Sequence, residues 1–270
     1  MTNIHSTALV ADTVKLGRDV TIGPYCCVDG NVELGDNCRL DAHVVVTGDT
    51  RIGADTRIFP FASIGHVSQD LKYDGEPVFL EIGARNTIRE HVTMNPGTAQ
   101  GDSVTRVGDD NLFMVGVHVA HDCVVGNNVI LANNATLGGH VSVADYAILG
   151  GLTGVHQFAR IGAHSFVGAG SLVTEDVIPF GMVSGNRAVL GGLNLVGLKR
   201  RNFARDEINA LRAAYKDIFL TSDTNFQDRV IRARAAYAEA ALVQQMIEFI
   251  EVEKSRGFCL PSSASSLSGV

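Results

Sequence analysis

Apolar side chains recur at every sixth position through the first two thirds of the chain. In two runs, of eleven and twelve positions, the sixth residue is always Val, Ile, Leu or Phe, and an interruption separates the runs. They are Ile4, Val10, Leu16, Ile22, Val28, Leu34, Leu40, Val46, Ile52, Ile58, Ile64, Val107, Phe113, Val119, Val125, Leu131, Leu137, Val143, Leu149, Val155, Ile161, Val167 and Val173. A period of six excludes a single amphipathic helix, because six steps of about 100° scatter the set over three helical faces.

Each six-residue unit has the pattern of a short strand followed by a turn. In 32–37 (VELGDN), the first and third residues point to one side, the second to the other, and Gly, Asp and Asn suit a tight turn. Three such units close a coil of about 18 residues, and stacked coils form a parallel β-helix with strands about 4.8 Å apart. The period leaves the hand open, and the general rule for parallel crossovers favours right-handed connections.

Breaks in the phase divide the chain into segments. We expect a parallel β-helix over 1–190, with loop excursions near 68–79 and 97–104. Amphipathic spacing predicts a small α-helical domain over 191–258, and the Ser-rich segment 259–270 is expected to be a disordered tail. Because insertions in repeat proteins often build the binding face, the two loops are candidate parts of a site.

Composition narrows the class of protein. The chain has 270 residues, a net charge of −7 and a pI near 5.7, which argues against a nucleic-acid partner. The five cysteines show no metal-binding spacing. Without a signal-like N-terminus or a run of 18 apolar residues, we expect a cytoplasmic protein with no stable membrane insertion.

Several polar side chains fall on one edge of the predicted prism. They are His118, His121, His140, His156 and Gln157. The 18-residue coil makes His121 and His140 neighbours, one coil spacing of about 4.8 Å apart. Asp122 directly follows His121, and an adjacent carboxylate orients an imidazole and supports its charge during proton transfer. A neutral His121 beside a bound hydroxyl would be a general base.

Two alternatives stay open at this point. Any one of these histidines is also compatible with an exposed turn without function. His118, His121 and His140 are also a possible zinc set, as in the hexapeptide-repeat carbonic anhydrases, although the first two are expected to splay apart.

Two further polar segments are candidates for ligand binding. Gln69, Asp70 and Lys72 lie in the first loop and combine hydrogen-bonding groups with charge. The basic run 198–201 (LKRR) stands at the junction with the helical domain, and arginine suits phosphate recognition. A solvated surface is the alternative for both.

Longer strings extend this interpretation. The chain closely resembles the UDP-N-acetylglucosamine O-acyltransferases of lipid A biosynthesis, through ASIGHVSQDLKYDGEP (62–77), GDDNLFMVGVHVAHDCVVGNNVILANNATLGGHV (108–141), GLTGVHQF (151–158) and GNRAVLGGLNLVGLKRRNF (185–203). The resemblance implies a left-handed β-helix and a homotrimer with sites between neighbouring subunits. It implies transfer of an (R)-3-hydroxyacyl chain from acyl carrier protein to the 3-hydroxyl of UDP-N-acetylglucosamine, with no cofactor and no metal.

The same resemblance implies roles for individual residues. His121 matches the catalytic base, Asp122 its orienting acid, and Gly139 the backbone N–H that steadies the oxyanion. Substrate-binding positions are Gln69, Asp70, Lys72, His118, His140, His156, Gln157, Asn194, Arg200 and Arg201. Lys199 and neighbouring basic residues are expected to attract the acidic carrier protein.

Three positions bear on specificity. Asn95 stands where the enterobacterial pattern has His, and Val196 where it has a carboxylate, so N-acylation of a 3-amino sugar nucleotide stays open as an alternative. Ala169 falls at the coil that limits acyl length, and its methyl group is expected to shorten the groove relative to Gly.

Overall fold

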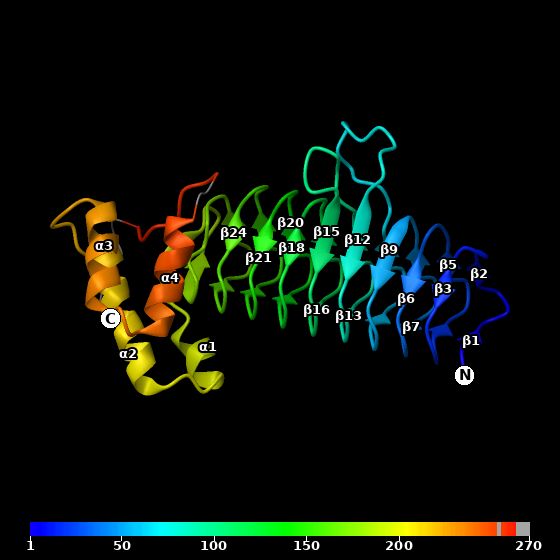
Figure 1. Ribbon diagram of the computed structural model, residues 1–270, viewed down its shortest axis with the longest axis horizontal. Coiled ribbons are helices and arrows are strands. Elements are labelled where there is room, and N and C mark those ends of the chain that lie inside the picture. Colours follow the sequence, from blue (N-terminus) through cyan, green and yellow to red (C-terminus); the bar gives the residue numbers. More distant parts are fainter. Residues whose placement is uncertain (253–254, 263–270) are drawn as a thin grey trace.

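The computed structural model describes residues 1–252 and 255–262 and has the shape of a long prism with helices at one end (Figure 1). Within these residues the strands form three sheets of eleven, nine and eight strands, parallel except for one final hairpin. Every parallel pairing joins one coil to the next in unbroken register, for example Asn3 with Thr21 and Thr21 with Arg39.

The strands are short and rotate through the three sheets. Sheet A holds β1 (Asn3–Ile4), β4 (Thr21–Ile22), β7 (Arg39–Leu40), β10 (Arg57–Ile58), β13 (Thr87–Ile88), β16 (Leu112–Phe113), β19 (Ile130–Leu131), β22 (Ile148–Leu149), β25 (Phe166–Val167), β27 (Gly181–Ser184) and β28 (Val189–Leu193). Sheet B holds β2 (Leu9–Val10), β5 (Cys27–Val28), β8 (Val45–Val46), β11 (Ser63–Ile64), β14 (Thr93–Met94), β17 (His118–Val119), β20 (Thr136–Leu137), β23 (Gly154–Val155) and β26 (Leu172–Val173). Sheet C holds β3 (Lys15–Leu16), β6 (Glu33–Leu34), β9 (Asp49–Ile52), β12 (Phe79–Ile82), β15 (Val104–Val107), β18 (Val124–Val125), β21 (Ser142–Val143) and β24 (Arg160–Ile161).

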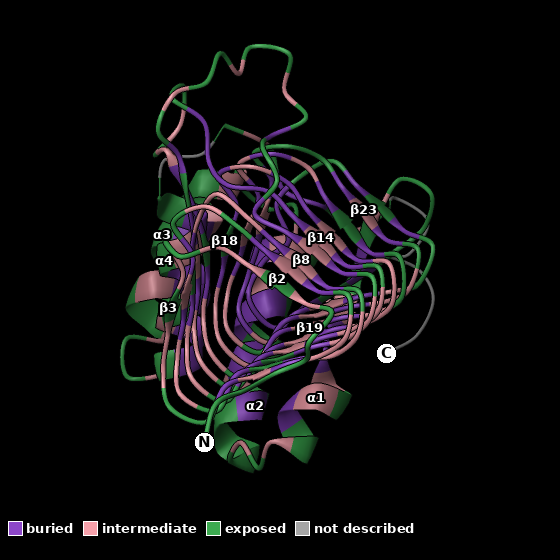
Figure 2. Ribbon diagram, turned by 90° about the vertical axis from the view of Figure 1, so that its right-hand side faces the viewer, coloured by how far each residue is buried: buried purple, intermediate pink, exposed green. Residues whose placement is uncertain are grey.

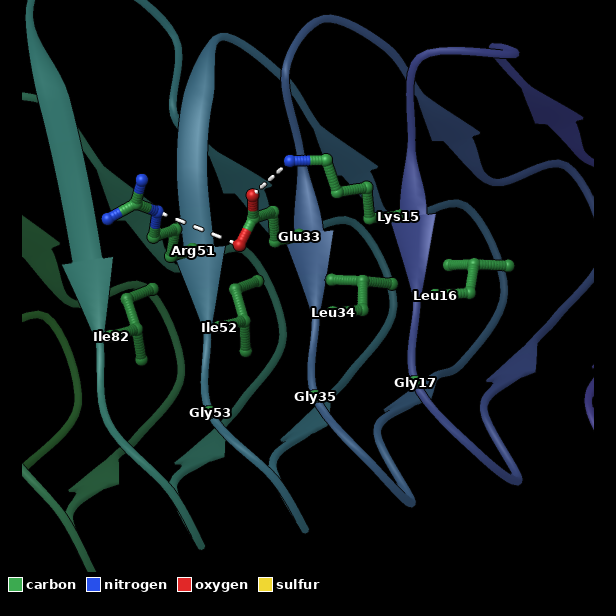
Figure 3. A pocket seen from close by; sticks show the side chains of 10 residues that line it. All are labelled: Lys15, Leu16, Gly17, Glu33, Leu34, Gly35, Arg51, Ile52, Gly53 and Ile82. Atoms are coloured by element: carbon green, nitrogen blue, oxygen red, sulfur yellow. Dashed lines mark hydrogen bonds and ion pairs between the residues drawn. The ribbon is translucent and has the colours of Figure 1, made fainter.

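The coils wind in a left-handed sense. In Figure 3 the near strands run downward, from Lys15 through Leu16 to Gly17, while successive coils move to the left. A chain that descends on the near side and advances to the left winds left-handed. The expectation drawn from the family resemblance is therefore confirmed, and the general crossover rule fails for this fold.

The repeating apolar positions form the interior of the prism. Ile22, Leu40 and Ile58 are at most 1% exposed and stack in successive coils of sheet A. At the three corners the chain takes positive φ, as at Asp122 (58°) and His140 (61°), which is uncommon outside glycine and permits the sharp change of direction. The sequence repeat thus specifies both the core and the corners.

The outer faces of the sheets differ in charge. Sheet C carries charged side chains, and Glu33 pairs with Lys15 at 2.6 Å and with Arg51 at 3.7 Å. Figure 3 shows this ladder beside a shallow hollow that exposes only the regular strand faces. The outward positions of sheet B, by contrast, carry no acidic or basic residue other than histidine: Leu9, Cys27, Val45, Ser63, Thr93, His118, Thr136, Gly154 and Leu172.

Helices follow the last coil. They are α1 (Leu195–Arg200), α2 (Arg205–Tyr215), the π-helical turn η1 (Lys216–Leu220), α3 (Phe226–Ala236) and α4 (Ala241–Glu251). Leu211 of α2 and Val243 of α4 are fully buried, so the apolar stripes face inward. The hairpin β27–β28 pairs with β25 and covers the open end of sheet A (Figure 1).

The end of the chain is only partly described. Cys259, in the segment expected to be a disordered tail, is buried, and its N–H donates to the Asp176 carbonyl at 2.9 Å. Residues 263–270 of that expected tail lie outside the described residues. Among the described residues, no helix combines the length and apolarity needed to cross a membrane.

The two loops leave the prism side by side (Figure 1). The first connects β11 to β12 and the second connects β14 to β15. They are joined by hydrogen bonds from Ala99 N–H to Glu76 Oε1 at 3.3 Å and from Gly97 N–H to the Phe79 carbonyl at 3.2 Å. Both loops stand over the corner between sheets B and C (Figure 2).

Candidate active site

His121 and Asp122 form a hydrogen-bonded pair in the turn between β17 and β18. His121 Nδ1 lies 2.8 Å from Asp122 Oδ2. A carboxylate only accepts, so Nδ1 carries the proton and Nε2 is left with a free lone pair. The Asp122 side chain is 2% exposed and that of His121 is 15% exposed, which leaves the imidazole as the accessible member. This is the geometry of an oriented general base.

The Asp122 carboxylate is held from its other side by Thr98. The Thr98 N–H donates to Oδ1 at 3.1 Å and its hydroxyl donates to Oδ2 at 2.6 Å. Thr98 lies in the second loop and was missed by the sequence interpretation, which singled out that loop but none of its side chains. Nothing in the sequence pairs Thr98 with Asp122, which lies 24 residues later.

His140 lies one coil further along the same corner. Its ring meets His121 edge to face at 5.1 Å and stacks on Phe158 at 4.5 Å. Burial lowers the pKa of His140, and the nearby Asp122 carboxylate, 3.8 Å from Nε2, acts in the opposite direction. The predicted adjacency of His121 and His140 is present in the structure.

The first loop brings Asp70 over the imidazole. Asp70 Oδ2 lies 4.0 Å from His121 Nε2, on the side opposite Asp122. The Lys72 backbone N–H, which donates to Asp70 at 3.0 Å, holds the pKa of that carboxyl below its usual range. Asp70 is therefore an acceptor in its ionised form at neutral pH.

A pocket surrounds the accessible edge of His121. It is lined by Gln69, Asp70, Lys72, Asn95, His118, Ala120, His121 and Gln157. His118 accepts or donates at Thr93 Oγ1 over 2.7 Å, and burial lowers its pKa. Asn95 donates from Nδ2 to the His66 carbonyl at 2.8 Å, so it fastens the base of the first loop. Six predicted site residues, His121 among them, thus line one pocket.

Gly139 lies directly against the His121 ring. A Cβ at this position would come within 2.5 Å of both Cε1 and Nε2 of His121. Within residues 1–252 and 255–262 its backbone N–H donates to no protein acceptor. An unused donor beside the base is what an oxyanion contact requires.

Other predicted site residues lie elsewhere in this chain. Asn194 caps α1, accepting from Gly197 N–H at 3.0 Å, and donates to the His164 carbonyl at 3.0 Å. Arg200 is exposed at the end of α1, and Ala169 is exposed at the corner between sheets A and B. His156 follows β23 at the corner between sheets B and C. It is exposed, and its Nδ1 contacts the Gln157 carbonyl at 3.1 Å.

Arg201 joins an aromatic column at the corner between sheets C and A. Its Nη2 donates to the Tyr146 carbonyl at 2.9 Å, its guanidinium carbon lies 5.0 Å from the Tyr146 ring centre, and its Nη1 lies 3.3 Å from His164 Nδ1. The His164 ring stacks between Tyr146 and Phe180. This second cluster, defined by Tyr146, His164 and Arg201, is on a different corner from His121.

The His164 ring makes stability depend on pH. Burial, with the charge of Arg201, lowers the pKa of His164 from 6.5 to about 4. Below about pH 6.5 the unfolded chain binds a proton at His164, whereas the folded chain binds it only near pH 4. The free energy of unfolding is therefore not reduced by His164 above about pH 6.5, and it falls as the pH is lowered toward about 4. We expect His164→Phe, which keeps the stacked column, to lose less thermal stability than the parent between about pH 7 and pH 4.5. Unfolding midpoints measured across this range, with the exposed His5→Ala as control, check it, and equal slopes would contradict it.

The side chains at the corner of His121 also include a possible set of metal ligands. His121, Asp122 and His140 each place one ligand atom within 4.8 Å of the others. However, Asp122 Oδ2 already accepts from both Thr98 and His121, so a cation would have to displace two hydrogen bonds. The donor set fits proton transfer better than metal ligation.

Comparison with known proteins identifies the class. A stacked-coil prism with an oriented histidine at one corner has the architecture of a hexapeptide-repeat transferase. In agreement, the model of bacterial transferase hexapeptide repeats matches residues 13–48 and 105–139. The model described as UDP-N-acetylglucosamine O-acyltransferase, domain 2, matches residues 176–259.

Full-length relatives narrow the class to a family. The acyl-[acyl-carrier-protein]–UDP-N-acetylglucosamine O-acyltransferase of Rickettsia bellii is 50% identical over 268 residues, covering 99% of this chain and 95% of that protein. The enzyme of the same name from Rickettsia canadensis is 51% identical over 257 residues, covering 95% of this chain and 97% of its own length. The solved UDP-N-acetylglucosamine acyltransferase of Francisella novicida superposes with a TM-score of 0.93 at 36% identity, covering 98% and 96% of the two chains. The chain belongs to the UDP-N-acetylglucosamine O-acyltransferase family.

Proposed function

We propose that this protein transfers an (R)-3-hydroxyacyl chain from acyl carrier protein to the 3-hydroxyl of UDP-N-acetylglucosamine, the first step of lipid A biosynthesis. The observation that carries the proposal is the buried Asp122 paired with an accessible His121 at the edge of a polar pocket. The relatives of about 50% identity, named for O-acylation, favour the hydroxyl acceptor over the 3-amino alternative and over a metal enzyme.

The reaction follows from the free lone pair of His121 Nε2. This nitrogen takes the proton of the sugar 3-hydroxyl as the oxygen attacks the thioester carbonyl, and Asp122 stabilises the imidazolium that forms. The Gly139 N–H donates to the oxyanion of the tetrahedral intermediate. Collapse of the intermediate breaks the C–S bond, and the carrier-protein thiolate takes the proton back from His121.

The polar groups of the first loop bind the acceptor. Asp70, ionised at neutral pH, accepts a hydrogen bond from a sugar hydroxyl, and Lys72 donates to a sugar or phosphate oxygen. His118, Gln157 and Gln69 complete the wall around the ring. The uncharged Asn95 fills the place where the enterobacterial pattern has histidine, so its contact with substrate is through an amide.

In a trimer, Arg200 and Arg201 would lie far from His121 of their own chain but close to His121 of a neighbouring copy. The corner between sheets A and B, with Tyr25 61% exposed and Phe61 52% exposed, would lie at a three-fold axis. The uncharged face of sheet B would then meet sheet A of the neighbour, whose outward residues from Leu112 to Phe166 are apolar. On the side away from the three-fold axis, His121 of one copy would meet the second cluster (Tyr146, His164 and Arg201) of the next copy.

The positions of His140 and of the second cluster along the prism axis agree with this arrangement. Symmetry about a three-fold axis keeps each residue at one level along the prism. Arg201 lies over Tyr146, which is six residues beyond His140 and so belongs to the same coil. Asn194, Arg200 and Arg201 of a neighbour would therefore meet the phosphates or the pantetheine arm at the level of His140.

Mixed trimers test this shared site. We expect His121→Ala and Arg201→Ala each to be nearly inactive, and their co-assembled mixture to recover activity. If each site takes its histidine and its arginine from different copies, about one quarter of the sites in a random equal mixture are intact. Specific activity of the reassembled mixture checks this, with separately assembled and then mixed proteins as control. A mixture no more active than its parents would contradict the shared site.

The overall function is tested by direct assay. Carrier-protein thioesters are offered with UDP-N-acetylglucosamine and with its 3-amino analogue, and the product is identified by mass. We expect the ester of the hydroxyl acceptor, and no acylated product from either sugar would overturn the proposal. A series of acyl lengths run on the parent and on Ala169→Gly shows whether the exposed Ala169 methyl limits the chain.

Partner and location follow from surface properties. Lys199 and Arg200, exposed on α1, and Arg205 on α2 offer positive charge to an acidic carrier protein, an attraction that salt screens. All five cysteines are free, and burial raises the pKa of Cys123 to about 12. Unpaired thiols support a place in the reducing cytoplasm.

A further inference from the structure

The second loop packs against the catalytic pair at Asp122, its buried member. It runs from Gly97 to the start of β15, and its first polar side chain, Thr98, is 1% exposed. Two N–H groups, those of Gly101 and Ser103, donate to the Thr98 carbonyl at 3.0 and 3.1 Å. The loop therefore fixes Thr98 by its own backbone before any contact with the site is made.

Both donors of Thr98 point at one carboxylate. The hydroxyl lies 2.6 Å from Asp122 Oδ2, the same oxygen that accepts from His121, and the N–H lies 3.1 Å from Oδ1. One donor on each oxygen fixes the rotation of the carboxylate about its Cβ–Cγ bond. A buried carboxylate without such donors would lose both orientation and stabilisation of its charge.

Close packing of the loop depends on glycine. A Cβ on Gly101 would meet Asp122 Oδ1 at 2.4 Å and the His140 ring at 2.8 Å. The loop thus lies flat on Asp122 and His140 and excludes water from the back of the pair, which strengthens the hydrogen bonds there.

We propose that Thr98 is a positioning residue for the acyl transfer, because its hydroxyl and N–H hold Asp122 in the orientation that fixes the His121 tautomer. This inference rests on the proposed function of His121 as base. Both donors of Thr98 contact Asp122, so it acts on the reaction through that carboxylate.

Substitutions that keep the shape of the side chain test the role. Thr98→Val removes the hydroxyl and keeps the volume, and we expect kcat to fall roughly 10-fold to 100-fold, the range for a lost hydrogen bond to a charged group. KM for UDP-N-acetylglucosamine should stay within about 2-fold, because the pocket wall is unchanged. Thr98→Ser should keep most of the activity, and Gln100→Ala, on an exposed residue of the same loop, should behave as the parent.

A double-mutant cycle separates positioning from general damage. In an Asp122→Ala background, Thr98→Val should change kcat by less than about 3-fold, because the group it acts through is gone. An equal loss in both backgrounds, an unchanged kcat in Thr98→Val, or a Ser variant as weak as the Val variant would overturn the inference. If Thr98→Val does not fold, the Ser variant and the same cycle with Thr98→Ala decide the question. Loss of activity in His121→Ala with none in Thr98→Val would refute this inference alone, whereas an active His121→Ala would refute the assigned base.

Discussion

Replacing His121 by alanine is expected to lower kcat by at least about 10²-fold, the low end for loss of a general base, while the protein stays folded. The side chain lies in a corner turn, outside the apolar interior, so its removal leaves the strand ladder intact. Its Nδ1–H is bonded to Asp122 and its Nε2 faces the pocket, so no neighbouring nitrogen takes over without moving. Steady-state kinetics with an unchanged circular dichroism spectrum check this result.

The matched control is His5→Ala, at an exposed histidine beside a turn of the first coil. Its activity should equal that of the parent. The His140 ring centre lies 5.1 Å from that of His121. If His140 does not replace the missing base, His121→Ala with His140→Ala should be no worse than His121→Ala alone. Activity of His121→Ala near the parent value would remove the residue from its role.

A single methyl group on Gly139 is expected to be almost as damaging. In Gly139→Ala the new Cβ would lie 2.5 Å from two atoms of the imidazole, so the ring must turn away from the substrate hydroxyl. A misplaced base costs about 10²-fold in rate even when every group is present. We expect kcat to fall by about that factor while KM and the thermal midpoint change little.

Gly151→Ala provides the comparison. Gly151 lies in a turn of another corner, where a methyl group would contact only the Asn133 carbonyl, at 3.2 Å. This variant should keep the activity of the parent, since no part of the site touches it. Equal kinetics for the two alanine variants would show that the contact between Gly139 and His121 has no bearing on turnover.

The repeat predicted the scaffold well because its signal is redundant. A hexad in which Ile22 faces inward is confirmed by Leu40 and Ile58 one and two coils later, so local ambiguity cancels. The adjacency of His121 and His140 followed from the same counting. The hand did not follow, since it depends on how the corners turn, and the residue types at the corners are too varied to encode it.

Contacts made by the loops were beyond the reach of the sequence. Thr98 approaches Asp122 across 24 residues, and Asp70 approaches His121 only because the first loop folds back over the corner. Neither contact follows from the six-residue repeat. The separation of Arg201 from His121 within one chain also had no local signal, and in the trimer proposed above the two residues of one site come from different copies.

The register of the coils sets how such a site can change during evolution. Phe79 pairs with Asp49 and Ile82 with Ile52, so the chain re-enters the prism in step after the first loop as though no residues had intervened. An inserted loop can therefore lengthen, shorten or be exchanged without displacing His121 relative to His140. One extra residue within a hexad, by contrast, would turn every later inward side chain outward. The distance between His121 and His140 is therefore set by the coil spacing, whatever the length of the two loops beside them.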